Sequence, residues 1–425
     1  MQKTWFIFYN FLIVPFLYIS IRLLGLFNPK IREGLEDRKM LFERLINDTA
    51  NLDRSKKLFW FHSASMGEFE QAKPIIQQLK ENRDVNVLIT FFSPSGYKNS
   101  LKYPYADVVS YLPFDTPSRV KKFLEITGPD LIVLMRYDVW PNLTWQCFKQ
   151  KIPCMIVDAT MAPNSKRKWP VVKQFHYTLY RCFAKILTVS DKDRNGFLEF
   201  GIKPENLESV GDTRYDRVHQ KSINAKEMKL FEDGFFNGKK VFVFGSSWES
   251  DEDVILPAFF KLAEHDKDVI MIIAPHEPSI IHLEKLENTF IRKQRSIRFS
   301  YLKNYKGERI ILIDSIGILL TLYYYSDVVY VGGSFREGVH NVLEPAVYGS
   351  PVIFGPKIDS SQEAIAMIKE GGGIMVNDKK QAYRIIRTLF MNEEIRKAAG
   401  EKARLFVEKH LGATEKICRH IEKYL

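Results

Sequence analysis

Glu68 stands after an apolar run and a glycine in the segment FHSASMGEFEQA, residues 61–72. A carboxylate at the start of a helix that follows a buried strand can act as a general base and accept the proton of a hydroxyl group. The three-residue spacing between Ser65 and Glu68 also fits a capping box, in which the glutamate only completes the first helical turn. The spacing by itself leaves both roles open.

A second candidate site lies in the segment YVGGSFREGVHNVLEPAVYGSPVIFGP, residues 330–356. Two glycines follow an apolar run there, and His340, Asn341 and Glu344 come after them. We expect a strand, a glycine turn, a short helix over residues 339–347 and a second strand. Glycines let the backbone approach a ligand and a helix N-terminus offers free N–H groups, so the pattern indicates a phosphate-bearing ligand. An ordinary strand-to-helix turn would carry the same glycines.

Further polar clusters follow other apolar runs in both halves of the chain. They are SPSGY at residues 93–97, RYDVWPN at 136–142, GSSWES at 245–250 and PHEP at 275–278. Each cluster alone is compatible with helix capping, since Ser, Asp and Asn satisfy the free N–H groups of a first turn. Their recurrence in both halves favours two facing rims of polar residues with a ligand cleft between them.

The apolar runs themselves predict the strands of two parallel sheets covered by helices. The runs are residues 58–61, 85–91, 130–135, 152–157 and 186–189, and then 241–244, 269–274, 310–313, 328–331 and 352–354. A polar stretch separates the two sets. We therefore expect an α/β protein with two doubly wound, Rossmann-like domains joined near residue 220 and facing each other across a cleft. Ligands of such sheets bind beyond the carboxyl ends of the strands.

The composition indicates an anionic partner and a reducing compartment. Lys and Arg number 62 against 51 Asp and Glu, which gives a net charge of +11 and suits a nucleic acid, a membrane surface or a phosphorylated substrate. The four cysteines lack CxxC spacing, so we expect reduced core thiols and a cytoplasmic setting rather than disulfides or a zinc site. No Asp-x-Asp pair precedes the glycine turn, and nothing in the pattern requires a metal ion.

The N-terminus carries a long apolar segment, WFIFYNFLIVPFLYISIRLLGLF, at residues 5–27. It is long enough to cross a bilayer, and the basic residues at 30–39 would hold the rest of the chain on the cytoplasmic side. A cleaved signal peptide and a helix lying in the membrane interface are the alternatives. The expected division is an anchor at residues 1–28, a first domain at 29–220 and a second at 221–425, with the C-terminal helix returning to the first domain.

The order of several motifs resembles that of a known family. The motifs are FHSASMGEFEQA, FFSPSGY, LPFDTP, VWPN, GDTRYD, IDSIG, YVGGSF and HNVLEPAVYGSPVIFGP. Together with the apolar N-terminus they resemble the bacterial 3-deoxy-D-manno-octulosonic acid (Kdo) transferases from about residue 5 to the C-terminus. The resemblance implies the two-domain GT-B fold of glycosyltransferases. It also implies inverting transfer of Kdo from CMP-Kdo to a lipid A precursor at the cytoplasmic face of the inner membrane, where anionic lipid lies.

The resemblance assigns roles to individual positions. Glu68 matches the catalytic glutamate of the family. Donor binding is expected at Ser246, Ser247, His276, Ile316, Gly317, Gly332, Gly333, Ser334, His340, Asn341 and Glu344. Within this set, His340 and Asn341 would donate to phosphate or sugar oxygens and Glu344 would accept from ribose hydroxyls. The acceptor or the cleft is expected to contact His62, Ser65, Gly67, Ser93, Arg136, Asp138 and Arg214.

Three positions depart from the family pattern. The family often has two acidic residues before Trp-Pro-Asn, where this chain has Arg136 and Asp138. It commonly has Pro-Arg-His-Pro where this chain has PHEP at residues 275–278, and a lysine where this chain has Arg214. These departures leave two rivals open: a membrane glycosyltransferase with another nucleotide sugar, and a non-catalytic nucleotide-sugar binder. A nucleic-acid binder fits the charge, but the chain has no basic and aromatic binding module.

Overall fold

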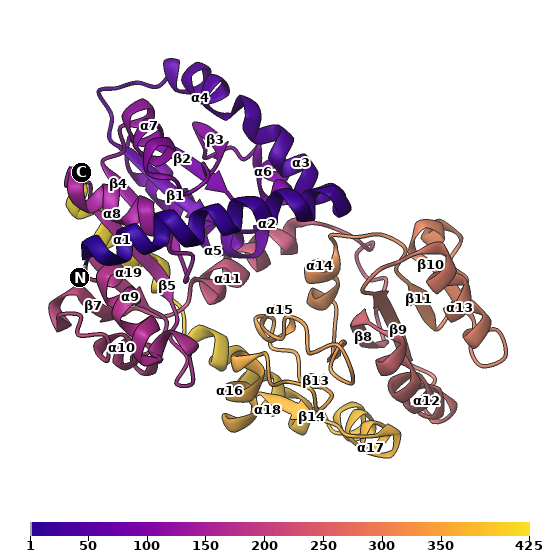
Figure 1. Ribbon diagram of the computed structural model, residues 1–425. Coiled ribbons are helices and arrows are strands. Elements are labelled where there is room, and N and C mark those ends of the chain that lie inside the picture. Colours follow the sequence, from indigo (N-terminus) through magenta and orange to yellow (C-terminus); the bar gives the residue numbers. More distant parts are fainter. Residues whose placement is uncertain (1) are drawn as a thin grey trace. The chain divides into compact units, whose positions relative to one another are not determined.

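The computed structural model describes residues 2–425 and divides into two compact units. The first unit holds the chain up to Arg217 together with Leu411–Leu425, and the second holds Val218–His410. The division falls inside helix α11, Thr213–Glu227. The last helix of the chain, α19 (Ala413–Ile421), packs beside α5 (Met66–Asn82) of the first unit, as Figure 1 shows.

The first unit is built on a parallel sheet of seven strands in the order β3-β2-β1-β4-β5-β6-β7. This is the order of a doubly wound sheet, in which the chain starts at the centre and turns back once. The strands are β1 Leu58–Ser63, β2 Asn86–Phe91, β3 Val108–Tyr111, β4 Leu131–Met135, β5 Cys154–Ala159, β6 Lys185–Thr188 and β7 Leu207–Ser209. The central strands are buried on both faces, which explains their continuous apolar runs.

The second unit repeats this plan with the order β10-β11-β9-β8-β12-β13-β14, also parallel throughout. Its strands are β8 Lys240–Ser247, β9 Val269–Pro275, β10 Ser296–Arg298, β11 Ile310–Leu312, β12 Val328–Val331, β13 Val352–Phe354 and β14 Gly373–Met375. The predicted fold class, two doubly wound domains of GT-B type, is confirmed.

The ten strands predicted from apolar runs are present, and the four that the sequence missed are the edges of the two sheets. These are β3, β7, β10 and β14, each only three or four residues long. An edge strand pairs on one side only and keeps part of its surface in water, so it lacks the long apolar run of a central strand. In β10 and β14 no residue is fully buried.

Helices cover both sheets, and most of them begin at residues suited to a first turn. Five helices of the first unit start with proline, whose missing N–H would have no partner there in any case. The first unit contains α1 Gln2–Phe8, α2 Val14–Phe27, α3 Pro29–Asp37, α4 Leu41–Ala50, α6 Pro94–Ser100, α7 Pro117–Thr127, α8 Pro141–Gln150, α9 Pro170–Tyr180 and α10 Asp191–Leu198. The second contains α12 Glu249–His265, α13 Ile280–Phe290, α14 Leu319–Tyr324, α15 Leu343–Ala346, α16 Gln362–Lys369, α17 Lys379–Met391 and α18 Glu393–Glu408.

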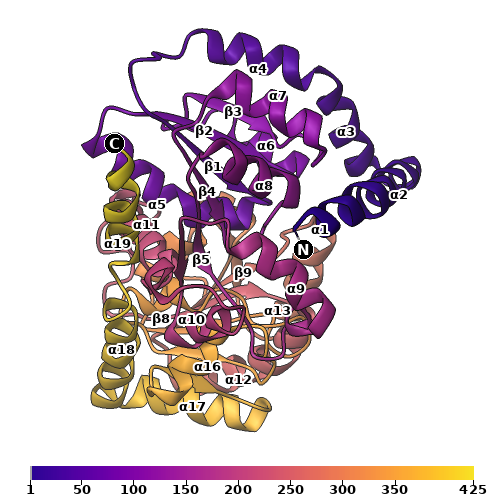
Figure 2. The same ribbon diagram turned by 60° about the vertical axis from the view of Figure 1, so that its left-hand side comes forward.

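The apolar N-terminal segment forms one helix, Lys3–Phe27, that is long and apolar enough to cross a membrane by length and composition. A π-helical turn at Tyr9–Ile13 joins α1 to α2. One side of this helix packs on the first unit, where the ring of Tyr9 contacts Trp145 of α8 and Phe175 of α9. Figures 1 and 2 show the helix running along the outside of that unit, and its opposite side exposes large apolar side chains.

Buried Asp115 connects this helix to the rest of the first unit through hydrogen bonds. Its carboxylate accepts hydrogen bonds from the Tyr9 hydroxyl at 2.9 Å and from the backbone N–H groups of Asn142 and Leu143 at 2.9 and 3.0 Å. The side chains of Asn10 and Asn142 add a reciprocal pair of hydrogen bonds. Burial raises the pKa of Asp115 to about 6, while the three donors oppose that rise. One carboxylate therefore joins the N-terminal helix to the start of α8.

Removal of this carboxylate should destabilise the first unit. We expect Asp115→Ala to lower the free energy of unfolding by about 2–4 kcal/mol, because three buried donors lose their acceptor. Thermal unfolding of the detergent-solubilised chain, followed by circular dichroism, measures the loss. Asp48→Ala, at an exposed position of α4, is the matched control. An Asp115→Ala variant that melts with the wild type would contradict the role given to this side chain.

Candidate active site

Glu68 lies in the first turn of α5, directly beyond the carboxyl end of β1, and is 9% exposed. Its Oε2 accepts a hydrogen bond of 2.7 Å from the backbone N–H of Ala64, so one oxygen does take part in the helix start. Burial raises the pKa of Glu68; the Ala64 hydrogen bond lowers it, and nearby Asp138 raises it further. A carboxyl group with a raised pKa is suited to accept a proton near neutral pH.

His62 and Asp138 form a polar chain in the neighbourhood of Glu68. His62 is fully buried, and its Nε2 donates to Asp138 Oδ2 at 2.7 Å. Its Nδ1 lies 2.9 Å from the hydroxyl of Thr90, which itself accepts from the indole N–H of Trp60. Burial alone would raise the pKa of Asp138, but hydrogen bonds from His62 and Trp140 bring it below the ordinary value. The carboxylate of Asp138 is thus held ionised beside a carboxyl group that burial favours as neutral.

Arg136 follows β4 in a left-handed backbone conformation with φ of 61°, which is unusual for a residue with a side chain. Its Nε is buried and has no hydrogen-bond partner among residues 2–425. The positive charge of Arg136 lowers the pKa of Glu68 and so opposes the effect of burial. A strained backbone and an unpaired donor at the end of a central strand are typical of functional sites.

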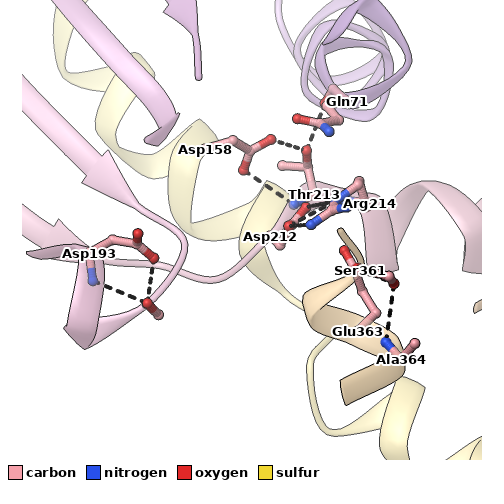
Figure 3. A network of polar contacts seen from close by, with 10 residues as sticks. Gln71, Asp158, Asp193, Asp212, Thr213, Arg214, Ser361, Glu363 and Ala364 are labelled. Atoms are coloured by element: carbon pink, nitrogen blue, oxygen red, sulfur yellow. Dashed lines mark hydrogen bonds and ion pairs between the residues drawn. The ribbon is translucent and has the colours of Figure 1, made fainter. Parts of the chain in front are cut away.

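Arg214, predicted at the acceptor or the cleft, is paired with an acidic neighbour. Its guanidinium binds the carboxylate of Asp212 through Nε and Nη2, at distances of 2.6–3.1 Å. Figure 3 shows this pair next to Thr213, whose hydroxyl bonds to Asp158 and to the backbone oxygen of Gln71. Burial, with the charge of Asp212 as a second cause, raises the pKa of Asp158 to about 7.

The remaining residues predicted in the first unit, Ser65, Gly67 and Ser93, lie at the starts of two helices. Ser65 and Gly67 are exposed at the start of α5, beside Glu68. The Ser93 hydroxyl accepts from the backbone N–H of Gly96 at 3.1 Å and therefore caps α6. The first unit thus brings His62, Arg136 and Asp138 into electrostatic contact with Glu68, while Ser93 serves its helix.

The second unit contains a cavity of 470 Å³ at the carboxyl ends of its central strands. Predicted residues on its wall are Ser246, His276, Gly317, His340, Asn341 and Glu344. Sequence reasoning missed Lys221, Leu319, Leu320 and Tyr323, which complete the wall. Lys221 supplies a positive charge from α11, far from any glycine motif, and only the folded chain brings it to this cavity.

His276 and His340 form one stack of rings with Trp248. The ring centroids of Trp248 and His276 lie 4.7 Å apart, and those of His276 and His340 lie 4.4 Å apart. The Trp248 indole N–H donates to His340 Nε2 at 2.8 Å, so a neutral His340 must carry its proton on Nδ1. Burial, and then the charge of His276, lower the pKa of His340.

Glu344 and Asn341 occupy the cavity wall together. Asn341 Nδ2 donates to Glu344 Oε1 at 3.1 Å, and the Asn341 Oδ1 accepts from the backbone N–H of Leu343. Burial raises the pKa of Glu344, while the charge of Lys221 and the Asn341 hydrogen bond lower it. The cavity therefore combines a cationic side chain, two imidazole rings, an amide and a carboxyl group, which can together bind a phosphate and neutral hydroxyl groups.

The two glycines of the turn lie close to other parts of the chain. A Cβ on Gly332 would lie 2.1 Å from the Ser246 oxygen, and one on Gly333 would lie 2.3 Å from the Gly338 oxygen. The glycines are thus required by the packing of the chain on itself. Ser334 is buried and accepts from the N–H of Gly355 at 2.6 Å, so it braces the turn and does not line the cavity.

Three further expectations for this unit are corrected. Ser247 is buried and its hydroxyl donates to Glu252 at 2.7 Å, whereas Ser246, with a left-handed φ of 51°, lines the cavity. The short helix α15 begins at Leu343, so its N-terminal turn does not follow Ser334 as expected. Ile316 is 80% exposed and absent from the cavity wall, although its neighbour Gly317 lines it.

The structure also shows the state of the cysteines and of possible metal ligands. All four cysteines are free and buried, as predicted. Within residues 2–425, no group of three or more His, Cys, Asp or Glu side chains is arranged to hold a metal ion.

Two doubly wound units with polar carboxyl-end sites define the GT-B type of fold, and solved structures agree. The UDP-GlcNAc 2-epimerase of Neisseria meningitidis, solved with UDP-GlcNAc bound, is 15% identical, with a TM-score of 0.60. The match covers 87% of this chain and 100% of the epimerase chain. At this identity the likeness shows the fold alone.

The family is shown by sequence. The family model described as 3-deoxy-D-manno-octulosonic-acid transferase (kdotransferase) matches residues 39–217. The 3-deoxy-D-manno-octulosonic acid transferase of Aquifex aeolicus is 30% identical over 354 residues, 81% of this chain and 90% of the relative. That of Haemophilus influenzae is 26% identical over 435 residues, 99% of each chain. The chain belongs to the 3-deoxy-D-manno-octulosonic acid transferase family and is a glycosyltransferase of lipopolysaccharide biosynthesis.

The hydrogen bond from Trp248 should control the titration of His340. Protonation of His340 at Nε2 would place two N–H groups against each other, so Trp248→Phe should raise the pKa of His340 towards its ordinary value. Histidine nitrogen shifts followed by NMR over a pH series measure this change and identify the tautomer. Trp169→Phe, at an exposed tryptophan of the first unit, should leave the His340 titration unchanged. Equal titration curves for Trp248→Phe and wild type would contradict the assignment.

Proposed function

We propose that this enzyme transfers Kdo from CMP-Kdo to a lipid A precursor, with inversion at the anomeric carbon. The observation that carries the proposal is the buried carboxylate of Glu68 with its raised pKa, near His62 and Asp138, in a chain of this family. Relatives that bear the name 3-deoxy-D-manno-octulosonic acid transferase support the same sugar.

The proposed reaction needs one proton acceptor and one group that stabilises the leaving phosphate. The acceptor hydroxyl oxygen bonds to the anomeric carbon of Kdo while the bond from that carbon to the CMP phosphate oxygen breaks. The hydroxyl proton passes to Glu68, and CMP leaves with the bonding electron pair. Asp138 stays ionised and disfavours a second negative charge on Glu68, which strengthens Glu68 as a base.

The cavity of the second unit is the proposed donor site. Lys221 would neutralise the CMP phosphate, and His340 and Asn341 would donate hydrogen bonds to its oxygens. Glu344 would accept from the ribose hydroxyls. His276 stands where the family commonly has an arginine, and its ring, stacked on His340, would offer an N–H to the same anion. We propose that these side chains make a divalent metal ion unnecessary.

The N-terminal helix is the proposed membrane attachment. Lys3–Phe27 exposes a continuous apolar side, and the basic residues of α3 and the turn after it follow directly. The exposed Lys30 and Lys39 would lie on the cytoplasmic side of an anionic membrane, whereas Arg38 is buried in the first unit. A lipid A precursor stays in the bilayer, so this attachment would bring the first unit to the level of its acceptor.

Glu68→Gln tests the base. The amide cannot accept the proton, and the transfer rate should fall by about a hundred- to ten-thousand-fold while folding and CMP binding persist. The assay supplies CMP-Kdo from Kdo, CTP and a CMP-Kdo synthetase, adds a tetra-acylated lipid A precursor, and detects products by mass. Glu81→Gln, at the far end of the same helix, is the control. Activity of Glu68→Gln within a few-fold of wild type would exclude this role.

The transfer rate in the same assay should depend on pH in a characteristic way. The raised pKa of Glu68 means that the base is protonated at a higher pH than an ordinary glutamate. The rate should therefore fall as the pH drops through that raised pKa, above the ordinary carboxyl range. Removal of the charge by Asp138→Asn should shift the fall to lower pH, provided that the variant keeps the wild-type melting temperature.

Glu344→Ala tests the donor site separately. The loss of a half-buried hydrogen-bond acceptor should weaken CMP binding by about 1–3 kcal/mol, because the ribose hydroxyls lose their partner. Isothermal calorimetry with CMP measures the dissociation constant, and Glu394→Ala on the exposed face of α18 is the control. An unchanged dissociation constant would leave Glu344 as a partner of Asn341 only.

A further inference from the structure

A second large cavity lies in the first unit, at the opposite edge of its sheet from Glu68. It is open to solvent and has a volume of about 1100 Å³ between the start of α1, the C-terminal half of α8 and the segments that lead into β5 and β6. Pro153 and Ala184 on its wall stand directly before these two strands. A strand of six residues spans roughly 15–20 Å, so this cavity is separate from the carboxyl-end site.

The interior of the cavity is apolar and belongs in part to the candidate membrane helix. Phe6 and Ile7 of that helix form one wall, and Phe148, Ile152 and Phe183 contribute to the others. The volume is at the upper end of the range for small-molecule sites, about 300–1,000 Å³. A large apolar cavity bounded by a helix suited to lipid is accessible to a lipid molecule.

Basic side chains surround this interior without acidic counterparts. Lys3, Lys149, Lys151 and Arg181 line the cavity and are exposed to solvent, and no Asp or Glu of residues 2–425 lines it. Lys149 and Arg181 stand at the ends of α8 and α9. Four cationic groups around one apolar cavity match a ligand that has an anionic head and an apolar tail.

Trp145 adds an independent observation. It lines the cavity, is 5% exposed, and its indole N–H is buried without a hydrogen-bond partner among the described residues. Buried N–H groups nearly always have a partner. The rings of Phe6, Tyr9 and Phe175 pack around the indole, and none of these residues accepts a hydrogen bond from it. An ester carbonyl of a bound lipid would supply one after a movement of the rings that cover this N–H group.

We propose that this cavity binds one anionic phospholipid, with its phosphate at the four basic side chains and an acyl chain in the apolar interior. The bound lipid would hold the N-terminal helix against the C-terminal half of α8, next to the Asp115 contact at the start of α8. The proposal rests on membrane attachment and not on the transfer reaction. CMP binding to the second unit therefore reports separately on the proposed function.

Native mass spectrometry of the full chain in detergent tests the proposal. Wild-type protein should retain one phosphatidylglycerol per chain and discriminate against phosphatidylcholine with the same acyl chains. The triple variant Lys149→Glu, Lys151→Glu, Arg181→Glu should weaken phosphatidylglycerol retention by about tenfold or more, because each basic group contributes to anionic lipid binding. The triple variant Lys102→Glu, Lys121→Glu, Lys203→Glu carries the same change in net charge at exposed positions outside the cavity and should retain the lipid.

A single substitution tests the apolar interior of the cavity rather than the basic side chains around it. Ala184→Phe places a ring in the cavity and should reduce retention of phosphatidylglycerol while CMP binding stays intact. Equal retention of both lipids, or equal retention by the two triple variants, would overturn the proposal. Displacement of the lipid by millimolar inorganic phosphate would also overturn it, since that result would define a phosphate site without a lipid tail.

Discussion

Parallel strand pairing is the constraint on which the rest of this structure depends. Because all seven strands of each sheet run in one direction, their carboxyl ends meet at a single edge. That edge collects His62, Glu68, Arg136 and Asp138 in the first unit, although they follow strands far apart in the sequence. In the second unit it collects Ser246, His276 and Gly317 in the same way. The common direction of the strands therefore brings the polar residues of each unit to one edge of its sheet.

The polar groups at these edges are partly buried, and burial creates the electrostatic properties of the site. Glu68 and Glu344 both have raised pKa values because their carboxyl groups have lost water. Neighbouring charges change these pKa values further: Asp138 raises that of Glu68, and Lys221 lowers that of Glu344. Arg136 and Ser246 lie at the ends of two strands and have left-handed backbone conformations. Such conformations are strained in residues with a side chain and are often found at functional sites.

The N-terminal helix packs on the first unit with one face and leaves the other face exposed. Its polar residues Tyr9 and Asn10 face Asp115 and Asn142, while its outer face stays apolar. Asn142 begins α8, and the segment before α8 contains Asp138 and Trp140 of the Glu68 neighbourhood. A continuous set of hydrogen bonds and covalent neighbours therefore runs from the helix to the proposed base.

The sequence alone determined the central strands, the two-domain class and the identity of Glu68 as a candidate base, because these depend on local patterns. Continuous apolar runs specify buried strands, and an ordered set of motifs specifies a family. The sequence did not reveal the edge strands, because their half-exposed faces carry no continuous apolar run. Nor did it show that the glycine turn at 332–333 serves internal packing.

Tertiary structure decided which polar side chains became partners. It paired Arg214 with Asp212 and Ser247 with Glu252, it brought Lys221 to the cavity of the second unit, and it placed Trp248 against His340. These pairings join residues through space at separations that no periodicity encodes. The physical reason is that a buried polar group must find a partner, and only the packed chain determines which partner is within hydrogen-bonding distance.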